Sequence, residues 1–373
     1  MKIYFKNDIQ WEEYYSLQSS VDQMMGMRDN LHKKNANGYY ETDFDNNLFN
    51  HMFFGGGLGI RTDNIYPGKL SLCIEYKYNK NKEAYLTYLA SSKGEKSGRI
   101  ENYTLFDEEN LFYRDDKSKK ISVYIPRDYD GKTSYDILYF FDAQNLFCNS
   151  GEYTTNGDPY GSWQLDVVLD EIYRQYGKKI LVVGIDNADS YRSQELFMDP
   201  DDFGKLSRIA KAIPSEDFSK GYLDNLAEFM QTTLHTFIKG KFNVNEDNIG
   251  IGGSSMGGIA AFYCGMRDLG FYRYILSYSP AFGLYEAKTF DSYLKFRWFS
   301  ENQEKLPKIH IYCGKGDKLE RLLLPASRGM RYLLVKNGYN DDLIFETYDD
   351  RKPHNEEAWR LVLPESFTFL LDL

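Results

Sequence analysis

The sequence predicts two parts: a small all-β domain, a β-sandwich, over residues 1–100, and an α/β domain with a doubly wound, mostly parallel sheet over residues 101–373. Three observations support this prediction. Short aromatic strands separated by turns fill the first 70 residues, strands and helices alternate after residue 100, and a small, polar linker-like stretch lies between them at 90–98.

The first part contains apolar and aromatic runs of strand length. The runs that predict strands are 2–5, 14–17, 39–44, 49–54 and 69–78. Clusters rich in asparagine, aspartate and glycine separate some of them, as at 35–38 and 45–47, and such clusters favour turns. We therefore expect strands joined by tight turns.

The second part alternates between the two kinds of element. The predicted strands are 121–126, 135–142, 180–185, 248–252, 274–278, 308–313 and 343–348, and the predicted helices are 163–176, 222–238, a helix beginning at 259–263, and 323–337. Residues 135–142 are almost continuously apolar, as expected for a strand covered on both faces of its sheet. The alternation predicts a largely parallel sheet with right-handed crossovers.

Composition limits the classes of function. A hydrophobic content of 42% and a charged content of 27% are typical of a folded globular protein. A net charge of −10 argues against a nucleic-acid partner, since phosphate binding needs a basic face. The chain has no apolar run of membrane-spanning length, and no apolar signal core follows Met1. We expect a cytoplasmic protein that binds no membrane, or a secreted one if the sequence as given is trimmed.

The cysteines predict no metal site. Cys73, Cys148, Cys264 and Cys313 are widely separated and lack metal-ligand spacing. We expect buried thiols, no metal and no organic cofactor.

The segment 253–258, Gly-Ser-Ser-Met-Gly-Gly, is the most informative motif. It follows the predicted strand 248–252 and precedes residues that begin a helix. Strand, G-x-S-x-G and helix together form the nucleophile elbow of α/β-hydrolases, in which glycines allow a tight turn that exposes the serine hydroxyl. Ser255 is therefore the candidate nucleophile.

A serine nucleophile needs a base, usually histidine. Four of the five histidines, His32, His51, His235 and His310, are expected to be structural. His354 instead occupies the loop between the last predicted strand and a final helix. Loops at the carboxyl ends of parallel strands are where such folds place their chemistry, so His354 is the candidate base.

The third member should be a carboxylate that follows the strand 308–313. Asp317 stands on a glycine-flanked turn directly after it and is the candidate acid, giving the order Ser…Asp…His. Glu320, one helical turn further on, is the alternative. Asp349 and Asp350 are too near the histidine in sequence to be attractive.

A tetrahedral intermediate requires backbone N–H donors. Met256, directly after the nucleophile, should supply one. The second should come from the turn 142–145 after the strand 135–142, and Gln144 is the candidate for this donor.

With these residues in place, the segment from about 118 to 373 resembles the esterase family that includes esterase D, enterochelin esterases and cellulosomal feruloyl esterases. The resemblance rests on four segments: Val123–Pro126 with Tyr129, Phe141–Phe147, the elbow, and His354 with Trp359. The second of these is similar to the family's DGQNLF turn, with Ala143 in place of glycine.

The resemblance also suggests residues around the substrate. The family's R..E pattern after the third strand corresponds to Arg192 and Glu195, which we expect to form a salt bridge that braces a loop. The alternative is that Arg192 binds a substrate carboxylate. Trp163 and Asp142 are further candidates for substrate contact.

The first part is similar to small starch-binding modules through residues 2–7 with Trp11, 39–40, 53–56 and 62–65. The usual Trp-Pro-Gly is replaced by 23–26, Gln-Met-Met-Gly, which removes part of the expected sugar platform. Glycan binding and a purely bracing role both remain open.

Together these features predict a serine carboxylesterase that acts on a carbohydrate-linked ester of the acetyl or feruloyl type. One alternative is an esterase for siderophore lactones or short-chain acyl groups. The other is a non-catalytic glycan-binding protein whose hydrolase domain is a relic.

Overall fold

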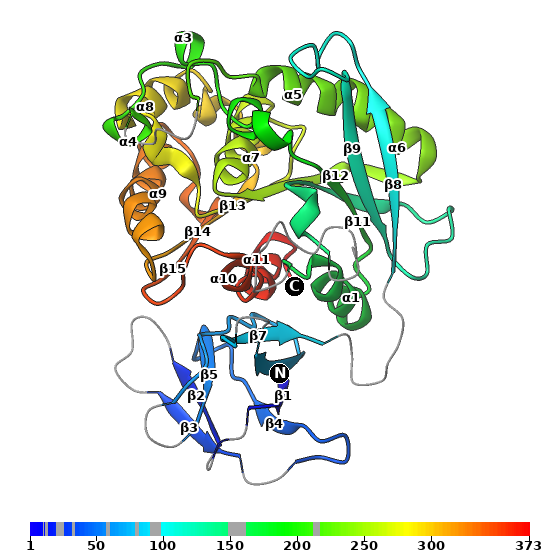
Figure 1. Cartoon of the computed structure of the whole chain (residues 1–373), viewed down its shortest axis with the longest axis vertical. Coiled ribbons are helices and arrows are strands. Elements are labelled where there is room, and N and C mark those ends of the chain that lie inside the picture. Colours follow the sequence, from blue (N-terminus) through cyan, green and yellow to red (C-terminus); the bar gives the residue numbers. More distant parts are fainter. Residues whose placement is uncertain are drawn as a thin grey trace. The chain divides into compact units, whose positions relative to one another are not determined.

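The computed structural model describes residues 1–9, 11, 14–19, 26–31, 34–56, 60–78, 82–89, 98–147, 162–211 and 217–373 (Figure 1). Contacts divide the chain into two compact units. Unit 1 comprises Met1–Gly98, Gln144–Lys179 and Asn355–Leu373, and unit 2 comprises Arg99–Ala143 and Ile180–His354.

Unit 2 is built on one eight-stranded sheet in the order β15-β14-β13-β12-β10-β11-β9-β8. The strands are β8 (Arg99–Phe106), β9 (Ser118–Ile125), β10 (Tyr135–Phe141), β11 (Ile180–Ile185), β12 (Val244–Ser254), β13 (Tyr274–Tyr278), β14 (Lys308–Gly314) and β15 (Ile344–Asp349). The strands from β15 to β11 pair in parallel, and β9 and β8 add an antiparallel edge.

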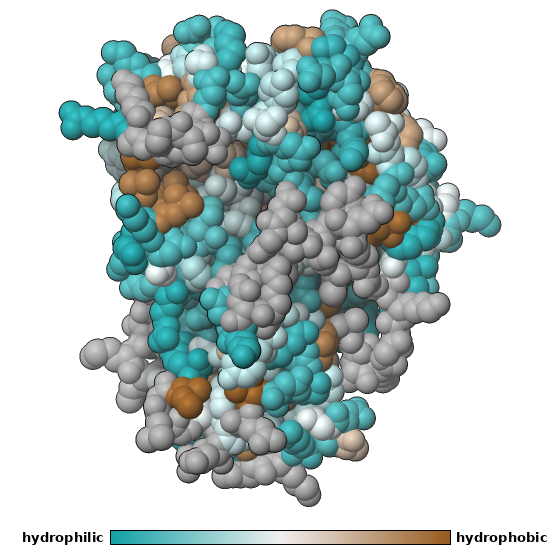
Figure 2. All heavy atoms as spheres, in the orientation of Figure 1, coloured by the Kyte–Doolittle hydropathy of each residue, from teal (hydrophilic) through white to brown (hydrophobic). Residues whose placement is uncertain are grey.

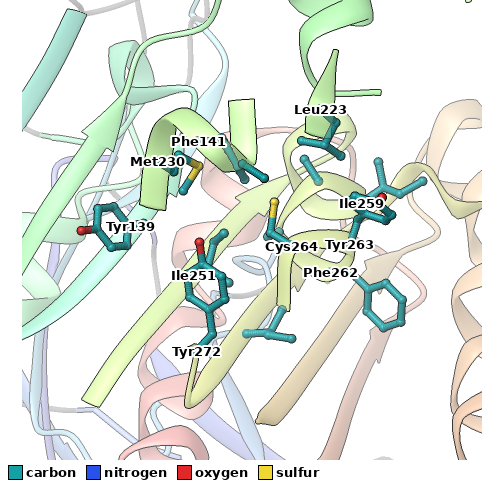
Figure 3. Packing of buried hydrophobic residues seen from close by; sticks show 14 of the residues in the cluster. Tyr139, Phe141, Leu223, Met230, Ile251, Ile259, Phe262, Tyr263, Cys264 and Tyr272 are labelled. Carbon is teal, nitrogen blue, oxygen red and sulfur yellow. The ribbon is translucent and has the colours of Figure 1, made fainter. Parts of the chain in front are cut away.

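Helices accompany these strands. They are α2 (Arg192–Glu195), α3 (Pro200–Phe203), α4 (Arg208–Lys211), α5 (Leu223–Phe229), the π-helical turn η4 (Met230–Leu234), α6 (His235–Lys241), α7 (Met256–Arg267), α8 (Ala287–Lys295) and α9 (Lys318–Lys336), with short 3₁₀ turns that include η3 (Asp189–Tyr191) and η5 (Ala281–Leu284). Figure 3 shows side chains of β10 and β12 meeting those of α5, η4 and α7 in the core. Tyr139, Ile251 and Ile259 are among these fully buried residues.

The parallel register places four strand ends on one edge of the sheet. Tyr278 of β13 pairs with Ser254 of β12 and with Tyr312 of β14, and Gly314 pairs with Asp349 of β15. Segments that follow these strands therefore emerge side by side, which is where open α/β sheets hold their ligands.

Unit 1 contains two small sheets. One has the order β4-β1-β6-β7 and the other β3-β2-β5. The strands are β1 (Lys2–Asn7), β2 (Tyr15–Ser19), β3 (Met27–Asn30), β4 (Tyr40–Asp43), β5 (His51–Gly55), β6 (Leu72–Tyr78) and β7 (Ala84–Tyr88). The rings of Phe5 and Phe54 stack at 3.8 Å, so the two sheets face one another.

Unit 1 also contains α1 (Leu165–Tyr176), α10 (Glu356–Arg360) and α11 (Leu363–Leu370). Polar contacts join α10 and the residue before α1 to β7. The backbone N–H of Leu86 donates to Glu357 at 2.6 Å, and the buried guanidinium of Arg360 donates from Nε to the Leu86 carbonyl at 3.1 Å. Gln164, directly before α1, accepts from the N–H of Tyr88 at 2.8 Å. The small sheet that contains β7 is thus hydrogen-bonded to segments from distant parts of the sequence.

The predicted fold class is confirmed: the larger sheet is mostly parallel, and a small β region precedes it. Strands β3, β7 and β8 were not predicted from the sequence, and the helix predicted at 323–337 begins earlier, at Lys318. The predicted boundary near residue 100 stays a prediction. The linker residues 90–97, Cys148, His32 and the segment 23–25 lie outside the described residues.

Hydrophilic residues cover most of the described surface on the face shown in Figure 2, and hydrophobic atoms gather there only in limited areas. Among the helices in the described ranges, none combines the length and apolar character needed to cross a membrane.

Candidate active site

Ser255 sits at a sharp turn between β12 and α7. Its φ of 56° and ψ of −118° lie in a sparsely populated region for a residue with a side chain. A Cβ atom on Gly253 would lie 2.5 Å from the Gly257 carbonyl oxygen, so glycine is required for the strand and helix to approach this closely. The local sequence therefore produces the strained elbow that the motif predicts.

The elbow is held by its neighbours. The N–H of Ser255 donates to the carbonyl of Tyr278 at 2.9 Å, and its own carbonyl accepts from the N–H of Ala281 at 3.1 Å. Met256 is the first residue of α7, so the helix itself offers no acceptor for its N–H. This N–H is therefore the candidate oxyanion donor beside Ser255, and its role stays a prediction. Gln144 lies in the 3₁₀ turn η2 (Ala143–Asn145), and its role as the second donor stays a prediction.

His354 follows β15, and its ring is anchored by Glu320. Nδ1 of His354 lies 2.9 Å from Oε1 of Glu320, whose side chain is completely buried. A carboxylate can only accept, so Nδ1 carries the proton in this pair and Nε2 is left as the basic nitrogen. The imidazole is thereby held in the tautomer that a general base needs.

The carboxylate of Glu320 receives further hydrogen bonds. Oε1 also accepts from the hydroxyl of Ser279 at 2.5 Å, and Oε2 accepts from the N–H of Gly314 and the thiol of Cys313, each at 3.0 Å. Burial and the nearby carboxylate raise the pKa of the Cys313 thiol, so it remains protonated and donates. Glu320 also lies in the first turn of α9, where the helix dipole favours an anion.

Asp317, the acid expected from the sequence, holds the main chain of the histidine instead of its ring. Its Oδ2 accepts from the backbone N–H of His354 at 2.7 Å, and its Oδ1 accepts from the N–H of Glu320 at 2.8 Å. Asp317 is therefore the N-cap of α9. The structure brings the alternative carboxylate, Glu320, to the imidazole, so Glu320 replaces Asp317 as the candidate acid.

The expected pair between Arg192 and Glu195 is also corrected. Arg192 binds Asp142 through two parallel contacts, at 2.7 and 2.8 Å. Glu195 is fully buried, and it pairs with the buried Lys119 and accepts from the hydroxyl of Tyr113 at 2.8 Å. The sequence pattern thus identified two charged residues that form ion pairs, but the partner of each comes from elsewhere in the chain.

Asp142 lies beside the elbow. It follows β10 with a φ of 59°, and its Oδ2 would be 3.1 Å from a Cβ on Gly257. Burial raises the pKa of Asp142, but the charge and hydrogen bonds of Arg192 outweigh it, so the pKa lies below its usual value. Arg192 therefore neutralises a buried anion beside Ser255, and its alternative role, contact with a substrate carboxylate, stays a prediction.

Trp163, the other candidate for substrate contact, is only 2% exposed. Its ring stacks on Trp359 with centroids 5.3 Å apart, both residues belonging to unit 1. This position favours a packing role.

The remaining described histidines have partners of their own. His235 lies 2.8 Å from the hydroxyl of Tyr139, and His310 lies 3.1 Å from the hydroxyl of Thr347. Burial lowers the pKa of His310 to about 3. The ring of His51 contacts Asn50.

The hydroxyl of Ser255 forms no hydrogen bond with any residue in the described part of the chain, the ring of His354 included. In esterases and other enzymes, the hydrogen bond between a nucleophile and its base is often long without substrate and shortens in the reacting complex. Strand topology still places Ser255, Glu320 and His354 after the carboxyl ends of β12, β14 and β15, at one edge of the sheet.

Ser279 and Cys313 were missed by the sequence reasoning. Ser279 follows β13, which lies between β12, the strand before Ser255, and β14, the strand before Glu320. Its position directly after a parallel strand was the available signal. Cys313, inside an apolar strand, gave no signal beyond burial.

The elbow on a mostly parallel sheet defines an α/β-hydrolase fold. Residues 116–370 match the family model described as "Putative esterase", and the chain belongs to this family. No curated protein sequence matches the chain.

Three solved structures illustrate the fold. A siderophore hydrolase, EstA from Aspergillus nidulans, has a TM-score of 0.55 and 14% identity over 74% of this chain and 95% of that one. An IroE-like serine hydrolase from Shewanella oneidensis has a TM-score of 0.52 and 13% identity over 73% and 80%. A CE1 ferulic acid esterase from Anaeromyces mucronatus has a TM-score of 0.50 and 14% identity over 74% and 91%.

Proposed function

We propose that this protein is a serine carboxylesterase with Ser255 as nucleophile, His354 as base and Glu320 as acid. The observation that carries the proposal is the imidazole of His354 held through Nδ1 by a buried carboxylate, at the sheet edge where a strained serine sits. A relic hydrolase would have no need to preserve both features.

The reaction follows from these positions. Nε2 of His354 takes the proton of the Ser255 hydroxyl while Oγ attacks the ester carbonyl. The N–H of Met256 donates to the resulting oxyanion, with Gln144 as the proposed second donor. His354 then returns the proton to the departing alcohol, leaving an acyl-enzyme that water hydrolyses by the same route in reverse.

The decisive experiment compares the wild type with Ser255→Ala on p-nitrophenyl acetate. We expect the substitution to lower kcat by roughly 10⁴- to 10⁶-fold. Ser254→Ala is the matched control, because this neighbouring serine ends β12 and precedes the elbow. Equal rates for wild type and Ser255→Ala would exclude the mechanism.

We further propose a carbohydrate-linked ester, of the acetyl or feruloyl type, as the substrate class. Unit 1 supports a glycan partner: the rings of Trp11 and Tyr14 lie 5.7 Å apart, those of Trp11 and Tyr76 lie 5.5 Å apart, and all three residues are partly exposed. Partly exposed aromatic faces of this kind can stack on sugars. The similar structures include a ferulic acid esterase, and ferulic acid esters belong to this class.

Two measurements test the substrate class. Retention on insoluble xylan or starch should fall in Trp11→Ala and persist in Trp298→Ala, which removes an exposed tryptophan of unit 2. Rates on acetylated xylan, methyl ferulate and a catecholate trilactone should favour the first two. A preference for the trilactone would support the siderophore alternative, as the siderophore hydrolase among the similar structures suggests.

A further inference from the structure

The short segment Tyr278–Ala281, between β13 and η5, contacts both ends of the proposed catalytic apparatus. On one side, Tyr278 and Ala281 hold the backbone of Ser255 through hydrogen bonds of 2.9 and 3.1 Å. On the other, Ser279 donates from its side chain to Glu320 at 2.5 Å. One tight turn thus links the nucleophile to the acid.

Ser279 is held in an unusual conformation. Its φ of 41° lies in the left-handed region that residues with a side chain rarely adopt, and the residue is fully buried. Its N–H donates to the carbonyl of Tyr312 in β14 at 2.6 Å, which fixes the backbone on the acid's side of the sheet. Strained residues of this kind persist where the surrounding structure holds them, and they concentrate at active sites.

The hydroxyl of Ser279 meets the same oxygen that accepts from the histidine. Oε1 of Glu320 receives Nδ1 of His354 and Oγ of Ser279, while Oε2 receives the donors of Cys313 and Gly314. Each oxygen of the Glu320 carboxylate therefore accepts a hydrogen bond from a group other than the imidazole of His354. Contacts other than the one to the imidazole therefore fix the plane of the Glu320 carboxylate.

We propose that Ser279 is a positioning residue of this esterase site, which aims Oε1 of Glu320 at the imidazole of His354 and couples the acid to the turn that holds Ser255. The inference rests on the proposed function. In the proposed mechanism Ser279 is not a reacting group, and it acts through Glu320.

The backbone conformation of Ser279 offers a sharp test. Ser279→Gly removes the hydroxyl but also relieves the strain of a positive φ, which offsets part of the stability lost with the hydrogen bond to Glu320, so its melting temperature should lie above that of Ser279→Ala. Its kcat on p-nitrophenyl acetate should nevertheless fall about tenfold with KM unchanged, since the lost orientation affects only the reaction step. Ser279→Ala should show the same loss in kcat.

Ser277→Ala is the matched control. Ser277 is also buried and lies two residues earlier, but its hydroxyl donates to the carbonyl of Gly258 at 2.9 Å and does not reach the acid. This variant should keep a kcat within about twofold of the wild type, because the contact lies outside the acid's network.

A double-mutant cycle separates positioning from general structural support. In the Glu320→Ala background, Ser279→Gly should change kcat by less than about twofold, because the residue through which it acts is absent. An undiminished tenfold loss there, or wild-type kcat in Ser279→Gly itself, would overturn the inference. If Ser255→Ala proved fully active, the proposed function would fail first, so the two failures are distinguishable.

Discussion

The carboxylate of Asp317 holds the main chain of His354, with Oδ2 2.7 Å from the backbone nitrogen. Glu320, three residues later, holds the ring of the same histidine. Two acidic residues at the start of one helix therefore fix His354 at two separate points, one on the backbone and one on the imidazole.

This division of roles predicts different costs of substitution. Glu320→Gln should lower kcat by about 10³- to 10⁴-fold, because the amide no longer favours the reactive tautomer or the imidazolium. Asp317→Asn should lower it less than about tenfold, since asparagine still caps a helix and disturbs only the placement of His354. Steady-state kinetics of both variants on p-nitrophenyl acetate check the ranking. The reverse order would return the acid's role to Asp317.

The pair between Arg192 and Asp142 predicts a compensating double variant. Arg192→Met should lower kcat by about tenfold or more, because it leaves a buried carboxylate without its guanidinium beside the elbow. Adding Asp142→Asn should restore part of the loss by removing the uncompensated charge. The rates are compared on a neutral and on an acidic ester. A loss confined to the acidic ester would instead indicate that Arg192 binds a substrate carboxylate.

Lys119 and Glu195 form a fully buried ion pair, so breaking it should destabilise the fold. Lys119→Met should lower the free energy of unfolding by about 3 kcal/mol, the lower end of the usual cost of breaking a buried pair, because Glu195 keeps a longer contact to Arg114 at 3.6 Å. Lys120→Met, at an exposed neighbouring position of β9, is the control and should cost less than about 0.5 kcal/mol. Chemical denaturation measures both. Equal stability of the two variants would contradict the prediction.

His310 predicts an acid-dependent loss of stability. Its folded pKa of about 3 lies below the ordinary value of 6.5, so between these pH values the unfolded chain binds a proton that the folded chain does not. Stability therefore falls as the pH falls through this window, by about 1.4 kcal/mol per pH unit from this residue once the pH is well below 6.5.

The measurement compares wild type and His310→Gln by denaturation at pH 7.0 and pH 5.0. The wild type should lose more stability than the variant between these two conditions, because glutamine does not titrate. Parallel losses in the two proteins would show that His310 does not carry the effect.

The sequence predicted the elements that carry the site better than the contacts within it. Strand ends and the elbow followed from apolar runs and glycines, which act locally. Asp317 was preferred to Glu320 as the candidate acid because the helix was expected to begin at residue 323, which left Asp317 on an apparently free turn. With the helix beginning at Lys318, Asp317 is its cap and Glu320 faces the histidine.

Other contacts depend on tertiary structure alone. Arg192 and Glu195 fit a local pair at helical spacing, but their actual partners come from β10 and β9. The role of Ser279 depends on β13 lying between β12 and β14, an order that no local pattern encodes.

The link between β7 and α10 has a consequence for synthesis on the ribosome. The N–H of Leu86 donates to the carboxylate of Glu357, which is translated 271 positions later. The carbonyl of Leu86 accepts from Arg360, which is translated later still. Until nearly the whole chain has emerged from the ribosome, the backbone N–H and carbonyl groups at this edge of β7 lack these hydrogen-bond partners. A nascent chain in that state exposes an edge that can pair with other strands, so we expect its maturation to depend on protection from aggregation during translation.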